Sequence, residues 1–194
     1  MADQKVCLVG AGNIANTHAA VLKASNGVTV SAVVDTNLVA AQALAKQFSG
    51  AKPFATLDEA LSARDFDRAH VLVPPPLHEA IAGALLKCGV SVLCEKPLAT
   101  TSEGSQNLLT LAQENGAILG TNQNYLFNPA FRELLKQVQS HTHGKLRHVI
   151  CTYNMPLRQL AGKQMSHWMF DTPLNMLLEQ AVHPLSLIRA LIGE

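Results

Sequence analysis

The chain has 194 residues, which is enough for one sizeable domain, or for one domain and part of another. Its composition is that of a globular protein, with 48% hydrophobic and 15% charged residues and a net charge of +1. This balance gives no electrostatic support for binding to nucleic acid or to an anionic membrane. The N-terminal residues lack the layout of a signal peptide and no apolar run approaches the length of a membrane span, so we expect a cytoplasmic protein.

Short apolar runs alternate with helical stretches over the first 121 residues. The apolar runs predict strands at 6–9, 28–34, 51–55, 69–73, 91–94 and 117–121. Helices are expected between them, at 14–23, 38–48, 57–62, 77–88 and 102–115. Because parallel neighbours in a sheet need crossover connections, this alternation predicts an α/β fold with a parallel sheet and helices on both faces.

The pattern changes after Asn124. We expect a helix over 129–139, a turn at 141–144, a half-buried strand over 146–153 and one apolar helix over 174–191. One strand and two helices are a poor basis for an independent core. We therefore divide the chain into an α/β domain at 1–121 and an incomplete α+β domain at 122–194, and interpret it as an N-terminal piece, or a short member, of a two-domain architecture.

A glycine-rich turn lies between the first expected strand and the first expected helix. It matches the dinucleotide-binding fingerprint of a Rossmann domain, with alanine at the third position: Gly10-Ala11-Gly12-Asn13-Ile14-Ala15. Gly10 permits the tight turn, Gly12 lets the backbone approach a pyrophosphate, and the small Ala15 lets the helix pack closely on the strand. The free N–H groups at the start of the helix would then bind the phosphates.

Asp35 ends the second expected strand, where the fingerprint places an acidic residue. A carboxylate there accepts hydrogen bonds from the adenosine ribose hydroxyls and repels a 2′-phosphate. No Arg or Lys follows closely, so NAD(H) is favoured and NADP(H) stays possible. The alternative is that Asp35 only caps the next helix. His18, one turn into the first helix, is expected to pack or to cap rather than to do chemistry.

Three further segments complete a family pattern. They are Val73-Pro74-Pro75-Pro76-Leu77-His78, Cys94-Glu95-Lys96-Pro97-Leu98 and Glu179-Gln180-Ala181-Val182-His183. With the glycine turn they resemble the glucose-fructose oxidoreductase, inositol dehydrogenase and rhizopine catabolism (Gfo/Idh/MocA) family over essentially the whole chain. The resemblance implies hydride transfer between a nicotinamide and a secondary alcohol or ketone of a sugar, cyclitol or related polyol. It also implies a homo-oligomer in the full-length form.

The same resemblance assigns the chemistry to three residues. Lys96, at the carboxyl end of the fifth strand, can hydrogen-bond a substrate oxygen and stabilise its negative charge. His183 is the candidate general base, and Glu179, four residues earlier, can share its helical face and orient the imidazole. Pro97, whose preceding bond is typically cis in the family, would help to aim Lys96. Pro184 would bend the helix beside His183.

The remaining segments are expected to form the cofactor pocket. The resemblance places Pro74, His78, Glu95 and Lys96 around the nicotinamide, together with Asp35 and residues 10–15 at the other end of the cofactor. No metal site is predicted. The pair His141 and His143 has no third ligand nearby and is interpreted as part of a solvated turn.

Several positions in the second half depart from the family. Gly is common where Ala181 stands, paired Gly where Leu174 and Asn175 stand, Asp where Ser186 stands, and an Arg is often seen near Leu126. These departures leave open a second hypothesis, a non-catalytic nucleotide-binding or interaction protein derived from the family. A third, a methyltransferase-like domain with another adenosine ligand, is disfavoured by the Glu-Lys-Pro segment.

Overall fold

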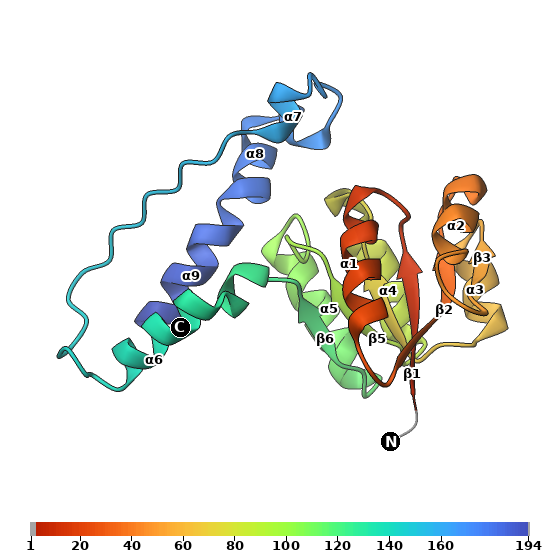
Figure 1. Ribbon diagram of the computed structural model, residues 1–194, viewed down its shortest axis with the longest axis horizontal. Helices are drawn as coiled ribbons and strands as arrows, with labels where there is room; N and C mark the ends of the chain where they lie inside the picture. Colours follow the sequence, from red (N-terminus) through yellow and green to blue (C-terminus); the bar gives the residue numbers. More distant parts are fainter. Residues whose placement is uncertain (1–2, 194) are drawn as a thin grey trace. The chain divides into compact units, whose positions relative to one another are not determined.

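The computed structural model describes residues 3–193, and the chain divides into two compact units, residues 1–122 and 123–194. The first unit contains a six-stranded parallel sheet with the strand order β3-β2-β1-β4-β5-β6 (Figure 1). Its strands are β1 Gln4–Val9, β2 Val28–Val34, β3 Lys52–Phe54, β4 Arg68–Val71, β5 Ser91–Cys94 and β6 Leu119–Thr121. The predicted α/β fold of Rossmann type is therefore confirmed.

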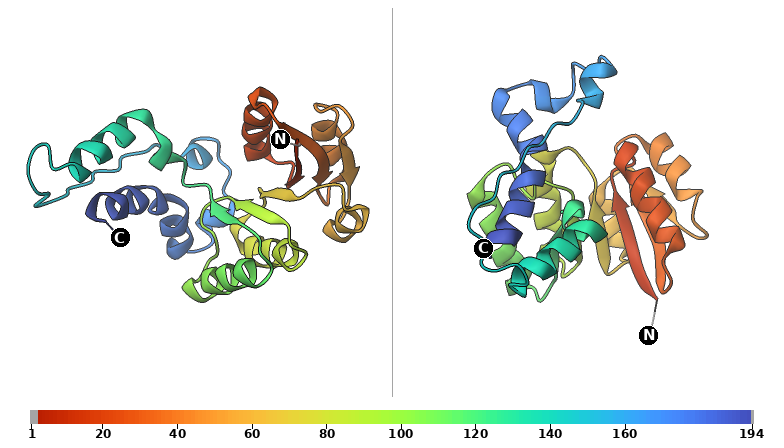
Figure 2. Two further views of the ribbon diagram at one scale, coloured as in Figure 1. Left: turned by 90° about the horizontal axis from the view of Figure 1, so that it is seen from below. Right: turned by 60° about the vertical axis from the view of Figure 1, so that its left-hand side comes forward.

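Helices connect these strands and cover the two faces of the sheet (Figure 2). They are α1 Asn13–Ala24, α2 Leu38–Ala45, α3 Leu57–Ala63, α4 His78–Lys87 and α5 Ser102–Glu114, with the short 3-10 turn η1 Pro75–Leu77 before α4. The strands contribute alternate residues to two cores, as buried parallel strands do. In β1, Val6 and Leu8 pack with α1 and α2, whereas Cys7 and Val9 pack with the helices of the other face.

The register of the sheet brings the carboxyl ends of four strands, and the loops that follow them, to the same edge of the sheet. Val9 pairs with Val71, Val71 with Cys94, and Cys94 with Thr121. The next residues of these four strands therefore lie side by side at the carboxyl edge of the sheet. The strand order reverses between β1 and β4, and open α/β sheets bind their ligands at such a switch point.

The second unit consists of helices and a long irregular segment. Its elements are η2 Asn124–Phe127, α6 Pro129–Gln139, α7 Arg158–Ala161, η3 Trp168–Phe170, α8 Pro173–Gln180 and α9 Val182–Ile192. Residues 145–157, between α6 and α7, have no regular structure (Figure 1). The strand predicted over 146–153 is therefore wrong. A strand needs a partner for its backbone groups, and the described part of this unit offers none.

The single helix predicted over 174–191 is also wrong, because a turn at Ala181 separates α8 from α9. Pro184 has no N–H to donate to the carbonyl of Gln180, and its ring clashes with that carbonyl in a continuous helix. Pro184 therefore explains why the helix is interrupted at Ala181. Across residues 3–193, no helix is long and apolar enough to cross a membrane.

Candidate functional site

The glycine turn after β1 has the geometry that a dinucleotide requires. Gly10 has φ of +103°, and a Cβ there would lie 2.7 Å from the carbonyl oxygen of Leu72, so only glycine fits. At Gly12 a Cβ would meet nothing within 4 Å. The glycine at this position is thus not required by the protein's own packing, and it leaves room for another molecule against the backbone. Ala15 is fully buried against the sheet, as close packing of α1 requires.

The first turn of α1 has backbone N–H groups that can bind an anion. Gly12 is its N-cap residue, and among the described residues no side chain caps the helix and no acidic side chain lies in its first turn. Asn13 and Ile14 are exposed at this end. Their N–H groups precede the first helical hydrogen bond, so they can donate to phosphate oxygens, and the helix dipole favours negative charge there. This end of the unit fits the pyrophosphate of a dinucleotide.

Asp35 braces this turn from the end of β2. Its Oδ2 accepts a hydrogen bond from the N–H of Ala11 at 2.7 Å, and its Oδ1 accepts one from the N–H of Asn37 at 2.8 Å. The side chain of Asn37, not that of Asp35, caps α2 by accepting from the N–H of Ala40. The carboxylate therefore holds the glycine turn, and its remaining lone pairs can accept from ribose hydroxyls. Residues 36–45 contain no Lys or Arg.

The ends of β4 and β5 are joined by His78. Its Nε2 lies 2.8 Å from the carbonyl oxygen of Val73, and its Nδ1 lies 2.7 Å from that of Pro97. His78 is fully buried, whereas Pro74 is exposed at the edge. His78 thus ties the two loops together from within the first unit and does not form part of its surface.

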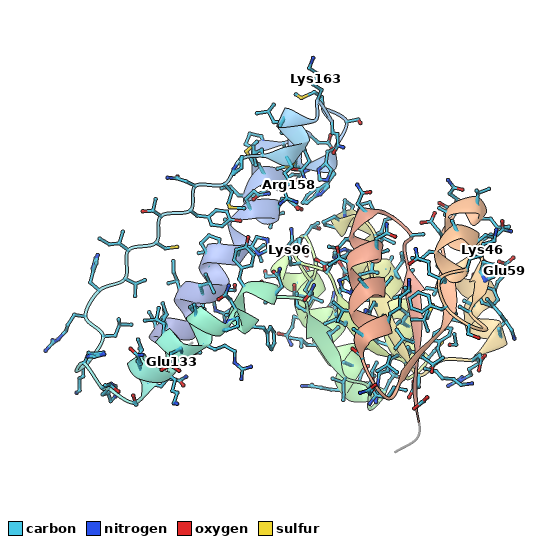
Figure 3. The ribbon with its side chains drawn as sticks, in the orientation of Figure 1. Lys46, Glu59, Lys96, Glu133, Arg158 and Lys163 are labelled. Carbon is cyan, nitrogen blue, oxygen red and sulfur yellow. The ribbon has the colours of Figure 1, made fainter. Side chains whose placement is uncertain are left out.

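Lys96 follows β5 at this edge (Figure 3), and the peptide bond between Lys96 and Pro97 is cis. The preceding Glu95 is largely buried and accepts three hydrogen bonds. The donors are His18 Nε2 at 3.0 Å, Asn122 Nδ2 at 2.6 Å and the N–H of Lys96 at 3.3 Å. Burial alone would raise the pKa of the Glu95 carboxyl, but these bonds and the charge of His18 lower it below its ordinary value.

His70, on β4, extends this group. Its Nδ1 lies 2.9 Å from Nδ1 of His18, and the two rings meet edge to face. Burial, and next the charge of His18, lower the pKa of His70 to about 4, although Glu95 opposes this. No local pattern in the sequence indicates a role for His70 or Asn122, and His18 was expected only to pack or to cap. His18 does pack, but α1 begins at Asn13, so it caps nothing.

The other two catalytic candidates, Glu179 and His183, lie in the second unit. Glu179 belongs to α8 and His183 to α9, so the expected shared face of one helix is divided by the turn at Ala181. The ring of Tyr125 stacks on that of His183, with centroids 4.4 Å apart and an angle of 19° between the planes.

Tyr153 lies beside this pair, 6.4 Å from each ring. Partial burial, a hydrogen bond with Tyr125 and the charges of Tyr125 and Glu179 raise the pKa of Tyr153 to about 12. A stacked tyrosine restricts the orientation of an imidazole, which suits a group that must accept a proton from a fixed direction. No motif in the sequence indicates a role for either tyrosine. Residues 3–193 contain no group of three or more His, Cys, Asp or Glu side chains that could hold a metal ion.

Comparison with known proteins agrees with this geometry. A family model described as the oxidoreductase family with an NAD-binding Rossmann fold matches residues 4–123. An inositol 2-dehydrogenase of Corynebacterium glutamicum is 30% identical over 144 residues, which are 73% of this chain and 43% of that protein.

Two solved structures are also similar. GenD2 from gentamicin A biosynthesis, in complex with NAD, is 31% identical with a TM-score of 0.69, over 73% of this chain and 40% of that one. KijD10, a 3-ketoreductase from Actinomadura kijaniata in complex with NADP and TDP-benzene, is 27% identical with a TM-score of 0.66, over 71% of this chain and 42% of that one. The chain thus spans less than half the length of these relatives.

Proposed function

The chain belongs to the Gfo/Idh/MocA oxidoreductase family, whose NAD-binding Rossmann fold it contains, and we propose that it is an NAD-dependent dehydrogenase of a sugar, cyclitol or related polyol. One observation carries most of this proposal. The carboxyl edge of one sheet combines an uncapped helix start, the space left by Gly12, the carboxylate of Asp35 and the segment of Lys96.

The cofactor would bind along this edge. The N–H groups of Asn13 and Ile14 would hold the pyrophosphate, the small Ala15 would keep α1 close to the strand behind them, and Asp35 would accept from the adenosine ribose. NAD(H) is favoured over NADP(H), because a 2′-phosphate would meet the Asp35 carboxylate with no Lys or Arg at residues 36–45 to compensate. Pro74 would lie against the nicotinamide. His78 and Glu95 would support the loops of this pocket from within.

The chemistry needs a hydride acceptor and a proton acceptor. When bound, the nicotinamide would accept the hydride that leaves the substrate carbon. Lys96 would hydrogen-bond the substrate oxygen and stabilise the charge that develops as its proton leaves, and His183 would take that proton. Glu179 would tune the imidazole, and Tyr125 would fix its plane. The second unit, with these residues, would be the beginning of the substrate domain.

Replacement of Lys96 tests this proposal. Lys96→Met keeps most of the length of the side chain and removes its charge, so we expect turnover of polyols with NAD to fall by at least about a thousandfold. Affinity for NADH, measured by calorimetry, should change by less than about threefold because the bond to the substrate oxygen is the one lost. Lys87→Met, at an exposed position of α4, is the matched control and should keep full turnover.

The other outcomes distinguish the alternatives. Full turnover in Lys96→Met would refute the catalytic role of Lys96. NADH binding by the wild type without turnover on any polyol would favour the non-catalytic hypothesis, for which the departures at Ala181 and Ser186 are the motivation.

A further inference from the structure

A cluster of four polar side chains lies inside the first unit, beneath the segment that carries Lys96. His18 comes from α1, His70 from β4, and Glu95 and Asn122 from the positions just after β5 and β6. His18 and Glu95 are 8% and 9% exposed. The four groups thus link one helix to three adjacent strands of the sheet.

Of the hydrogen bonds that His18 makes to Glu95 and His70, the one to Glu95 has a fixed direction. The Glu95 carboxylate can only accept, so His18 Nε2 must carry a proton and donate to it over 3.0 Å. Between the two Nδ1 atoms, one must donate and the other accept. A neutral His18 accepts from His70, whereas a charged His18 donates to it; in both cases the bond to Glu95 is kept. The cluster therefore maintains the donor at Glu95 in either protonation state of His18.

This polar cluster occupies a place where the sheet otherwise buries hydrocarbon. His70 is in register with Leu8 of β1 and Leu93 of β5, and Leu8 belongs to the apolar core under α1. Apolar residues would pack α1 onto the sheet without the desolvation cost of two imidazoles and a carboxylate. Local departures from such packing are typical of functional sites. The cluster ends on Glu95, which accepts the N–H of Lys96.

We propose that His18 is a positioning residue for Lys96. By donating to Glu95, it fixes the carboxylate that holds the Lys96 peptide, and Asn122 donates to the same carboxylate oxygen, so that the lysine is aimed before the substrate arrives. The effect on turnover rests on the proposed function, whereas the effect on the Lys96 peptide does not. Without the donor on His18, Glu95 is still buried but less well held, and the Lys96 segment becomes mobile.

Two substitutions separate this role from simple packing. His18→Leu keeps an apolar side chain at the position but removes the donor, whereas His18→Gln restores an N–H near the place of Nε2. His143→Leu, in the exposed turn after α6, is the matched control. Thermal unfolding is measured first, to show that each variant folds. If His18→Leu does not fold, the same measurements are made on His18→Gln.

The first readout requires no activity. In His18→Leu we expect the Lys96 amide to exchange with solvent at least about tenfold faster, since a lost hydrogen bond of about 1.4 kcal/mol corresponds to that factor. The pKa of Glu95, followed by carbon NMR, should rise because its burial persists without the donor. In His18→Gln both should stay near the wild-type values. In His143→Leu neither should change.

The second readout is kinetic. His18→Leu should lower kcat about tenfold and leave the affinity for NADH within about threefold, because a misplaced catalytic group affects the transition state more than binding. His18→Gln should recover most of kcat. Equal effects of His18→Leu and His18→Gln, or an unchanged Lys96 amide in both, would overturn the proposal. If the wild type binds no NADH, the proposed function fails, and the exchange and NMR readouts still decide the role of His18.

Discussion

The partly buried His70 should make the stability of the first unit depend on pH between 7 and 5. Its pKa is lowered to about 4 in the folded chain, mainly by burial, whereas an unfolded histidine titrates near 6.5. As the pH falls below 6.5, the unfolded chain therefore binds a proton that the folded chain does not. The stability that the neutral His70 allows is fully present above pH 6.5 and is lost progressively toward pH 4.

The size of this loss follows from the difference between the two pKa values. At pH 5 the pH lies about 1.5 units below the pKa of His70 in the unfolded chain. Each unit corresponds to about 1.36 kcal/mol, so the free energy of unfolding falls by about 2 kcal/mol. Glu95 adds little in this window, because a carboxyl with a lowered pKa loses its contribution only as the pH falls below about 4.3. His70→Asn keeps an amide near the place of Nδ1 but removes the titration.

Urea unfolding at pH 7 and pH 5, followed by far-UV circular dichroism, measures this effect. The only tryptophan, Trp168, lies in the second unit, so its fluorescence would report on the other part of the chain. The wild type and the exposed-histidine control His143→Asn should each lose about 2 kcal/mol more than His70→Asn between the two pH values. An equal loss in wild type and His70→Asn would refute the assignment of a depressed pKa to His70.

Three substitutions test the cofactor site. Gly10→Ala should lower the free energy of unfolding by about 1–3 kcal/mol and impair NADH binding, because its Cβ would meet the Leu72 carbonyl at 2.7 Å and its φ is positive. Gly12→Leu should unfold at nearly the wild-type temperature yet lose at least about tenfold in NADH affinity, since its side chain fills only the space left for the pyrophosphate; unchanged affinity would place the phosphates elsewhere. Asp35→Ser should reduce the preference for NADH over NADPH in calorimetric titrations by at least about tenfold, and an unchanged ratio would contradict the role given to the carboxylate.

Local patterns were sufficient for most of the first unit and for one helix of the second. The apolar runs at 28–34 and 91–94 match β2 and β5 at both ends, and the helix expected at 129–139 matches α6. These segments end at strong local signals such as Gly27, Asp35, Pro129 and the Glu-Lys-Pro segment. Residues 146–153 show why the same reasoning fails elsewhere. Alternation of polar and apolar residues predicts which face a strand would bury, but not whether a partner strand is present.

The polar cluster was the part of the site that sequence reasoning missed. Taken one at a time, each of its members can be explained by packing or by a position in a loop. The register of β4, β5 and β6 brings His70, Glu95 and Asn122 together, and α1 adds His18. A signal was nevertheless present. His70 interrupts an apolar parallel strand, and Asn122 directly follows β6 at the edge where Glu95 follows β5, as the carboxyl ends of parallel strands require.

A calorimetric titration of the chain with NADH and, separately, with NADPH tests the central claim most directly. We expect NADH to bind at one site per chain, and NADPH to bind at least about tenfold more weakly because of Asp35. In Gly12→Leu most of the heat of NADH binding should be lost. Binding of neither nucleotide by the folded wild-type chain would contradict the assignment of a dinucleotide site to the glycine turn and Asp35.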